Sequence, residues 1–364
     1  MFIEPSINIY DMDLEALSGL FQDVGEPSYR ARQAYQHLYI KLANRFEEMT
    51  DLPQKMRELL AERTRIGNLE IVTNWHGDGG MTQKVLFRLP GGETIETVLM
   101  VYSDRATVCV SSQAGCPMGC VFCATAKLGF LQDLTRGQIV EQVMWAARTL
   151  RGLSSVRSGN RLPTQLSNIV FMGMGESFNN YDEWWGAVEQ LHDPKGFNMG
   201  ARNFTVSTVG LVPGILRLAE ERLPVNLAIS LHAAEDHVRS EMMPVNKAYP
   251  IQTLLAATRD YAVKTRRRVS FEYVLLEGKN DAPEQAQTLV HVLREGPLAE
   301  IPHLIHVNLI PWNPVPSAPL ARSGRRRVRD FQRVLQDNRI PCTVRVERGL
   351  EINAACGQLA GVAT

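Results

Sequence analysis

Four of the six cysteines in the 364-residue chain lie between positions 109 and 123. The last three, Cys116, Cys120 and Cys123, have the spacing C-x3-C-x2-C, and Phe122 directly precedes the final cysteine. Thiolates on a short loop favour zinc, copper(I) or an iron–sulfur cluster. Structural zinc usually has four protein ligands, and the sequence offers no further C-x2-C or H-x3-H pair. The spacing therefore favours a three-thiolate centre with one position open to a ligand.

The composition is that of a globular chain, long enough for about two domains of ~150 residues. The formal net charge is zero, so any affinity for RNA must come from local patches. Residues 28–65 carry eight Lys or Arg against five Asp or Glu, and six arginines lie together between positions 322 and 333. Without further evidence, each patch also fits a solvated helix face.

The N-terminal sequence has neither a basic start nor a continuous apolar run, and no later stretch approaches ~18 uninterrupted apolar residues. Six clustered cysteines are too few for a secreted disulfide scaffold of this length. We therefore expect a cytoplasmic protein that does not associate with membranes. Nothing in the sequence indicates an obligate partner chain, so we expect a monomer.

Helical spacing predicts a small helical domain over residues 1–66, with helices near Asp11 and after Pro27. From Leu69 the period shifts to two over three strand-like runs, 69–73, 83–89 and 94–101, and a Pro-Gly-Gly turn at 90–92 separates the last two. We expect residues 67–101 to form a linker of antiparallel strands, with a linking β-hairpin, between the helical domain and the rest of the chain.

Beyond Ala106, sequences typical of buried strands alternate with segments of helical periodicity. The strand-like runs span 106–111, 168–172, 204–208, 225–230, 269–275 and 305–310. Six such units predict an α/β fold, a partial (βα)6 barrel over 102–348 rather than a closed barrel of eight strands. Thr135 and Gln138 form a capping box at the start of a helix, and residues 152–166 predict a surface loop.

Parallel sheets bind ligands at the carboxyl ends of their strands. All six predicted strands end in glycines or polar residues: the cysteine loop, Gly173-Met-Gly175-Glu176, Ser207, Ser230-Leu231-His232, Glu272, and Asn308 followed by Asn313. Each sequence alone also fits a tight turn, a helix cap or a hydrogen-bonded loop histidine. Their coincidence at every strand end predicts a ligand site.

With these residues in view, the chain resembles the RlmN/Cfr family of radical S-adenosylmethionine (SAM) RNA methyltransferases over nearly its whole length. The resemblance rests on the cysteine loop, Gly-Met-Gly-Glu176, Ser230-Leu231-His232, Phe271-Glu-Tyr-Val, Pro311-Trp-Asn313-Pro and Ala-Ala-Cys356-Gly-Gln-Leu. It implies a radical SAM barrel, an RNA-binding N-terminal domain, and a 4Fe-4S cluster on Cys116, Cys120 and Cys123. The SAM contacts it implies are Gly175, Glu176, Ser207, Ser230, Leu231, His232 and Asn313.

The resemblance also implies a reaction that uses two molecules of SAM per turnover. Cys356, in the C-terminal segment 349–364, first accepts a methyl group from one SAM. A radical generated from the second SAM activates that methyl group, which then joins an adenine carbon and links the RNA to Cys356. Cys109 resolves the adduct by attacking the Cys356 sulfur, and Glu96 or Cys109 accepts a proton. Without this resemblance, Cys109 would be a small buried hydrophobe, as we expect for Cys342.

The implied target is C2 of an adenosine in 23S rRNA and in tRNA. The resemblance also implies a reductant such as flavodoxin or ferredoxin, which supplies electrons to the cluster. One departure is Ser177, where most RlmN sequences have proline; Cfr proteins, which modify C8, also lack that proline. Three alternatives therefore remain: a Cfr-like C8 methyltransferase, a radical SAM enzyme that does not methylate, and a non-catalytic zinc-binding RNA module.

Overall fold

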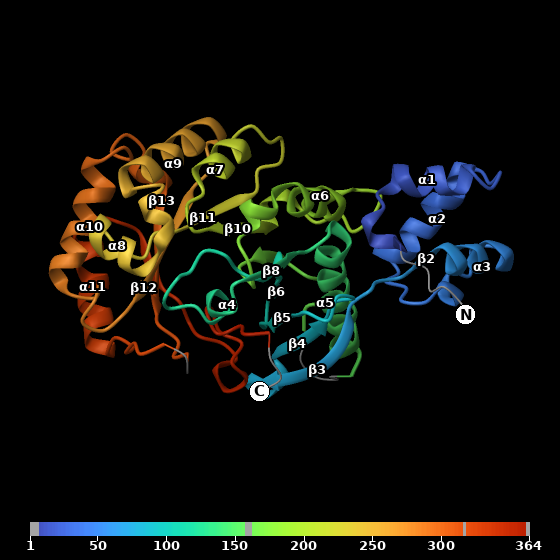
Figure 1. The fold of residues 1–364 in the computed structure, drawn as a ribbon, viewed down its shortest axis with the longest axis horizontal. Helices are drawn as coiled ribbons and strands as arrows, with labels where there is room; N and C mark the ends of the chain where they lie inside the picture. The colour runs from blue at the N-terminus through green and yellow to red at the C-terminus, as the bar shows by residue number, and fades with distance from the viewer. Residues whose placement is uncertain (1–6, 157–161, 316–317, 362–364) are drawn as a thin grey trace.

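The computed structural model describes residues 7–156, 162–315 and 318–361 (Figure 1). The N-terminal domain contains helices α1 (Leu14–Gln22), α2 (Ser28–Tyr39) and α3 (Gln54–Arg63). Asp13 caps α1 by accepting a 2.8 Å hydrogen bond from Ala16 N. The short parallel strands β1 (Ile7–Asn8) and β2 (Thr64–Arg65) pair the two ends of the domain. The helices expected near Asp11 and after Pro27 are both present.

Helix α5 (Arg136–Val156) joins this domain to the rest of the molecule. Its expected capping box forms, because Thr135 N donates to Gln138 Oε1 at 3.0 Å and Gln138 N donates to Thr135 Oγ1 at 3.2 Å. Arg148 then donates to the carbonyl oxygens of Leu42 and Ala43, at 2.9 and 3.0 Å. Arg148 of α5 therefore holds the segment that follows α2 in the helical domain.

The loop expected over 152–166 begins later than predicted, because α5 continues to Val156. Residues 157–161 of that prediction lie outside the described residues. No described helix is both long and apolar enough to cross a membrane.

One ten-stranded sheet organises the remainder of the chain, in the order β14-β13-β12-β11-β10-β9-β6-β5-β4-β3. The parallel strands are β6 (Ala106–Cys109), β9 (Asn168–Phe171), β10 (Phe204–Thr208), β11 (Asn226–Ser230), β12 (Val269–Leu275), β13 (Ile305–Pro311) and β14 (Cys342–Val344). The six predicted strands are thus confirmed. The parallel series also continues into β14, which contains Cys342.

The antiparallel strands expected over 67–101 are present, and they belong to the same sheet. Strands β3 (Glu70–Gly77), β4 (Thr82–Arg88) and β5 (Thr94–Val101) are antiparallel, and β5 pairs with β6 through Val98 and Cys109. The linker is therefore a three-stranded antiparallel extension of the sheet. This extension places Glu96 on the face of the sheet that carries Cys109.

The two faces of the parallel sheet differ in polarity. Apolar residues such as Phe171, Val206 and Leu309 are buried, and the longer helices line the outer side of the curved sheet (Figure 1). These helices are α5, α6 (Tyr181–His192), α7 (Val212–Leu218), α9 (Ile251–Thr265), α10 (Pro283–Glu295) and α11 (Arg325–Asp337). The alternate residues, including Thr205 and Asn308, are only half-buried. The concave face therefore borders open space, with polar and apolar side chains, rather than a filled core.

Candidate active site

The cysteine loop lies between strand β7 (Gln113–Gly115) and helix α4 (Ala124–Lys127). Glycine is required at 115, because φ is +70° and a Cβ there would lie 1.9 Å from Gly129 O. Cys116, Cys120 and Cys123 line one cavity of about 160 Å³, which we call the loop cavity. Burial raises the pKa of the Cys116 thiol to about 12. A bound metal would supply the positive charge that stabilises this thiolate.

The turn after β9 brings Gly175 and Glu176 to the loop cavity. At Gly175 φ is +102°, and a Cβ would lie 2.6 Å from the Gln113 side chain, so the turn needs glycine. Glu176 is buried, and its carboxylate accepts hydrogen bonds from Phe178 N at 3.1 Å and Val209 N at 2.8 Å. Burial raises the pKa of Glu176 to about 7. Glu176 therefore also fixes the backbone that follows β10.

Ser207, Ser230 and His232 line the same cavity from the ends of β10 and β11. The two serine hydroxyls are 3.3 Å apart. His232 Nδ1 accepts a 3.0 Å hydrogen bond from Val274 N, and its ring contacts Phe122 edge-on. Leu231, also expected to contact SAM, is fully buried and does not line the loop cavity. The Leu231 side chain packs in the hydrophobic core, although its neighbours in the sequence, Ser230 and His232, line the cavity.

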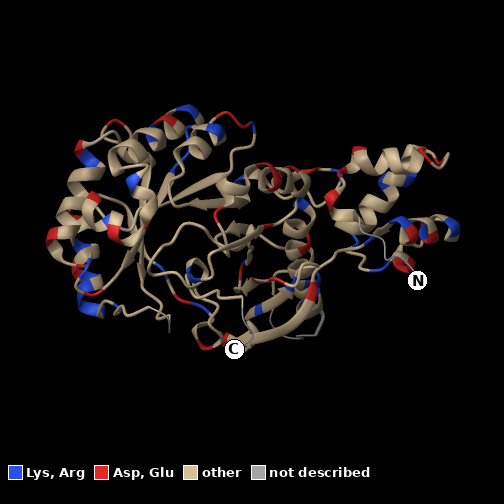
Figure 2. Cartoon of the chain, viewed as in Figure 1, with Lys and Arg blue, Asp and Glu red and all other residues tan. Residues whose placement is uncertain are grey.

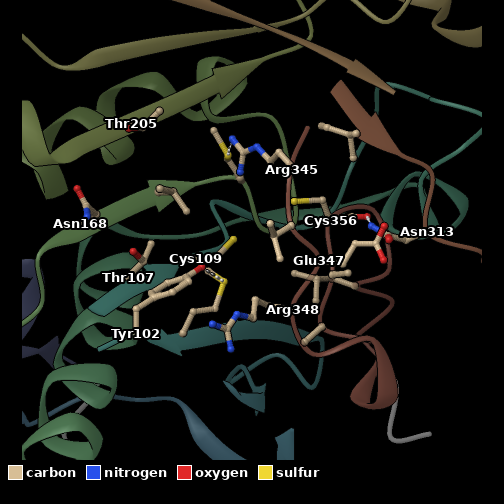
Figure 3. A pocket seen from close by; sticks show the side chains of 18 of the residues that line it. Tyr102, Thr107, Cys109, Asn168, Thr205, Asn313, Arg345, Glu347, Arg348 and Cys356 are labelled. Atoms are coloured by element: carbon tan, nitrogen blue, oxygen red, sulfur yellow. Dashed lines mark hydrogen bonds between the residues drawn. The ribbon is translucent and has the colours of Figure 1, made fainter. Parts of the chain in front are cut away.

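Cys356 lies where two cavities meet. It lines the loop cavity and also a cavity of about 270 Å³ on the concave face of the sheet, which we call the sheet cavity (Figure 3). Asn313 lines both cavities, and its Nδ2 donates to Cys356 O at 3.0 Å. Asn313 Oδ1 is buried and has no hydrogen-bond partner among the described residues. This free acceptor suits the adenine-side contact with SAM that is expected of Asn313.

Several distant parts of the chain hold the segment that carries Cys356. Ala124 N donates to Gly357 O at 2.8 Å, and Thr125 Oγ1 donates to Leu359 O at 2.7 Å, so α4 joins this segment to the cysteine loop. From the antiparallel strands, Thr94 Oγ1 donates to Gly361 O. These bonds fix the main chain on both sides of Cys356.

Cys109, at the end of β6, lines the sheet cavity but not the loop cavity. Burial, together with the nearby Cys356, raises the pKa of its thiol to about 12. Figure 3 shows Cys109 and Cys356 on the wall of the same cavity. Both cysteines therefore border the same cavity, while the two-cysteine chemistry that the resemblance implies stays a prediction. Cys342 lines neither cavity and packs against the core.

Glu96, the expected proton acceptor, lines neither cavity. Its Oε1 lies 2.7 Å from Lys84 Nζ, and its Oε2 accepts hydrogen bonds from Ala360 N at 2.7 Å and Gly361 N at 3.2 Å. In this geometry the carboxylate anchors the C-terminal segment.

Arg345 is a site residue that the sequence reasoning missed. It follows β14, lines both cavities, and forms a 3.4 Å ion pair with Glu272. Asn308 Nδ2 fixes the other oxygen of Glu272 through a 2.7 Å hydrogen bond. The positive charge of Arg345 lowers the pKa of Cys356 and Cys109, against the larger effect of burial. Its only signal in the sequence was a charged residue within an alternating Thr-Val-Arg-Val run.

The chain matches known proteins along most of its length. Residues 7–66 match the model described as ribosomal RNA large subunit methyltransferase N-terminal domain, and residues 110–290 match the radical SAM superfamily. A probable dual-specificity RNA methyltransferase RlmN of Chloroflexus aurantiacus is 61% identical over 97% of this chain and 92% of that protein. The chain belongs to the RlmN family.

Two further proteins agree with this assignment. Dual-specificity RNA methyltransferase RlmN 1 of Myxococcus xanthus is 44% identical, covering 98% of this chain and 95% of that protein. The crystal structure of a radical SAM methyltransferase from Sphaerobacter thermophilus is 47% identical with a TM-score of 0.91, and covers 98% of this chain and all of that one. The expected family and its radical SAM fold are confirmed.

Membership of the RlmN family excludes two of the alternatives, the zinc-binding module and the radical SAM enzyme that does not methylate. It implies a 4Fe-4S cluster and SAM. The residues present fit both groups. Cys116, Cys120 and Cys123 all line the loop cavity, and the unpaired Asn313 Oδ1 lines it too. No three possible ligands among the described residues are placed to hold a single metal ion, so these three sulfur donors suit a cluster of several irons instead.

Proposed function

We propose that this RlmN-family enzyme methylates C2 of an adenosine in 23S rRNA and in tRNA, and uses two molecules of SAM per turnover. The relatives named dual-specificity RNA methyltransferases support an RNA substrate. One structural observation carries the chemistry: Cys356 lines both the loop cavity and the sheet cavity. A residue in this position can take a methyl group on one side and deliver it on the other.

In this proposal, Cys116, Cys120 and Cys123 hold the cluster, while Gly175, Glu176, Ser207, Ser230, His232 and Asn313 surround SAM. Cys356 first acts as an ordinary thiolate nucleophile and becomes S-methylated. Arg345 stabilises the thiolate form against the cost of burial. When bound, the cluster and SAM supply the one-electron chemistry that activates this S-methyl group for bonding to the adenine ring.

Cys109 then releases the product. Its thiolate attacks the Cys356 sulfur, a disulfide bond forms between the two cysteines, and the bond from Cys356 to the RNA-linked carbon breaks with its electron pair. That carbon takes up a proton and becomes the methyl group, and cellular thiols reduce the disulfide. The proton at C2 must also leave. The position of Cys109 on the sheet cavity supports Cys109 as acceptor, while the acceptor role of Glu96 stays a prediction.

The deciding experiment is anaerobic. Protein reconstituted with iron and sulfide receives SAM, dithionite and protein-free 23S rRNA or tRNA, and the digested RNA is examined by nucleoside mass spectrometry. We expect 2-methyladenosine from both RNAs. Formation of 8-methyladenosine would instead establish the Cfr-like reaction that Ser177 leaves open. We further propose that the enzyme is a monomer and that flavodoxin or ferredoxin replaces dithionite in the cell.

A further inference from the structure

Arg239 is a buried arginine whose hydrogen-bond partners among the described residues are all neutral. It lies in helix α8 (Asp236–Met242), and its exposed fraction is 0%. Burial lowers the pKa of Arg239 to about 10, so the side chain keeps its charge near neutral pH. A buried charge without a direct ion pair is costly, so its presence points to a negative group that binds nearby. The acceptors of its hydrogen bonds are Val209 O at 2.7 Å, Asn246 Oδ1 at 2.8 Å, Leu231 O at 3.0 Å, Ser230 O at 3.2 Å and Tyr249 O at 3.5 Å.

Two of these acceptors belong to strand ends that line the loop cavity. Val209 follows β10 and Ser230 ends β11, and both line that cavity, although Arg239 itself does not. One guanidinium thus holds the main chain of two neighbouring strands from outside the cavity. Burial and the charge of Arg239 also lower the pKa of His232 to about 3, so this cavity residue is a neutral imidazole.

Helix α8 also contacts the cysteine loop. Val121 N donates to Met242 O at 3.0 Å, and Cys120 and Met242 belong to one buried apolar cluster. Burial raises the pKa of the Cys120 thiol, and the positive charge of Arg239 lowers it. Arg239 therefore lies close enough to Cys120 to stabilise negative charge on its sulfur.

The charge of Arg239 affects any redox centre that the cysteine loop binds. A positive charge nearby favours the reduced form, because reduction adds negative charge to the centre. Salt screens a buried charge much less than an exposed one, so the effect persists at physiological ionic strength.

We propose that Arg239 is a positioning residue for the reaction, which fixes the strand ends that hold SAM and makes a cluster on the cysteine loop easier to reduce. This assignment rests on the proposed function. It adds to that function a residue that lines neither cavity.

The role of the charge is tested by the midpoint potential of the cluster in protein reconstituted anaerobically with iron and sulfide. A redox titration followed by electron paramagnetic resonance measures it. We expect Arg239→Met to make reduction about 10-fold less favourable, which is about 59 mV for a one-electron couple. Arg239→Lys keeps the charge and should shift the potential less.

Arg148→Met is the matched control for this titration. Arg148 also donates to two main-chain carbonyl oxygens and to one side chain, and it lines neither cavity. Equal potentials for Arg239→Met and Arg148→Met would overturn the effect of Arg239 on the cluster.

The positioning role is tested by equilibrium dialysis of the same proteins against radiolabelled SAM. Both Arg239→Met and Arg239→Lys should bind SAM on the order of 10-fold more weakly, because lysine cannot reproduce the planar fork that holds both strand ends. SAM affinities equal to that of Arg148→Met would overturn this role.

Iron content and circular dichroism report whether each variant folds and takes up the cluster. If Arg239→Met failed in either, Arg239→Gln, which removes the charge and keeps a hydrogen-bond donor, would decide the potential instead. Failure of the proposed function has a different signature, because the unmodified protein would then take up no cluster, bind no SAM or yield no methyladenosine.

Discussion

Lys84 Nζ and Glu96 Oε1 lie 2.7 Å apart, and their side chains are only 2% and 1% exposed. The pair lies beneath the segment that carries Cys356. Glu96 accepts hydrogen bonds from the Ala360 and Gly361 amides, and Lys84 Nζ donates to Asn353 O at 3.4 Å. Two charges on neighbouring antiparallel strands therefore define where the reactive cysteine lies.

Removing one member of this pair should leave the other charge buried and unpaired. We expect Lys84→Met to lower the free energy of unfolding by about 3–5 kcal/mol, measured by urea denaturation. The exposed ion pair of Arg88 and Glu70 on the same sheet provides the comparison, because Arg88→Met should cost no more than about 1 kcal/mol. Equal losses for the two variants would show that the buried pair has no special role.

The variant Glu96→Gln separates an anchoring role from proton acceptance. If Glu96 anchors the segment, SAM-dependent methylation of Cys356 should slow by about 10- to 100-fold, because the thiol is misplaced. If Glu96 serves only as a proton acceptor, Cys356 should be methylated at the normal rate, while the covalent RNA adduct accumulates. Intact protein mass and a denaturing gel distinguish the two results.

Replacement of Cys109 should trap the reaction before product release. We expect Cys109→Ala to form a covalent adduct between Cys356 and RNA that survives a denaturing gel, since no second thiol is present to attack the Cys356 sulfur. Cys342→Ala is the matched control, because Cys342 lines neither cavity, and it should behave as the unmodified enzyme. A gel with free RNA alone for Cys109→Ala would remove Cys109 from the release step.

Methylation of Cys356 should accelerate as the pH rises. The residue is exposed, but the loss of water around its sulfur inside the site raises the pKa of the Cys356 thiol, while Arg345 opposes the shift, so the thiolate is the minor form at neutral pH. Below the pKa, the rate should rise about 10-fold per pH unit. Arg345→Gln should move the profile to higher pH, and this is measured from initial rates of protein methylation. An unchanged profile would mean that Arg345 does not act on the thiol.

The basic residues of the N-terminal domain should contribute to RNA binding. Arg32 is exposed, whereas Lys41 pairs with Asp51 at 2.5 Å. We expect joint neutralisation of Arg30, Arg32 and Lys41 to reduce RNA affinity and its salt slope. The control is neutralisation of Arg325, Arg326 and Arg327 on α11, which lies on the far side of the molecule from this domain (Figure 2). Loss of affinity in the control alone would assign RNA binding to α11 instead.

The sequence predicted those features that depend on local order. The six parallel strands and the capping box of Thr135 and Gln138 each lie within a few neighbouring residues, so their patterns identify them directly. The motifs at the strand ends were also sufficient to place Glu176, Ser207 and His232 in one cavity.

Features that depend on distant parts of the chain could not be predicted in this way. Arg345 enters the site because β14 joins the parallel sheet beside β13, and a three-residue strand has too short a pattern to show this. Glu96 occupies an alternating position that any polar residue of a strand could have. Only the folded structure reveals its partners, which are Lys84 on the neighbouring strand and two backbone amides of the C-terminal segment.

The hydrogen bonds that hold Cys356 also have a consequence for the synthesis of the protein. The partners in these hydrogen bonds all precede Cys356 in the sequence; they are Thr94, Ala124, Thr125 and Asn313. Because chains generally fold from the N-terminus during translation, the sheet and the cysteine loop can form before this segment leaves the ribosome. Each new molecule therefore acquires the capacity to bind its cofactors before it acquires the thiol that reacts with them.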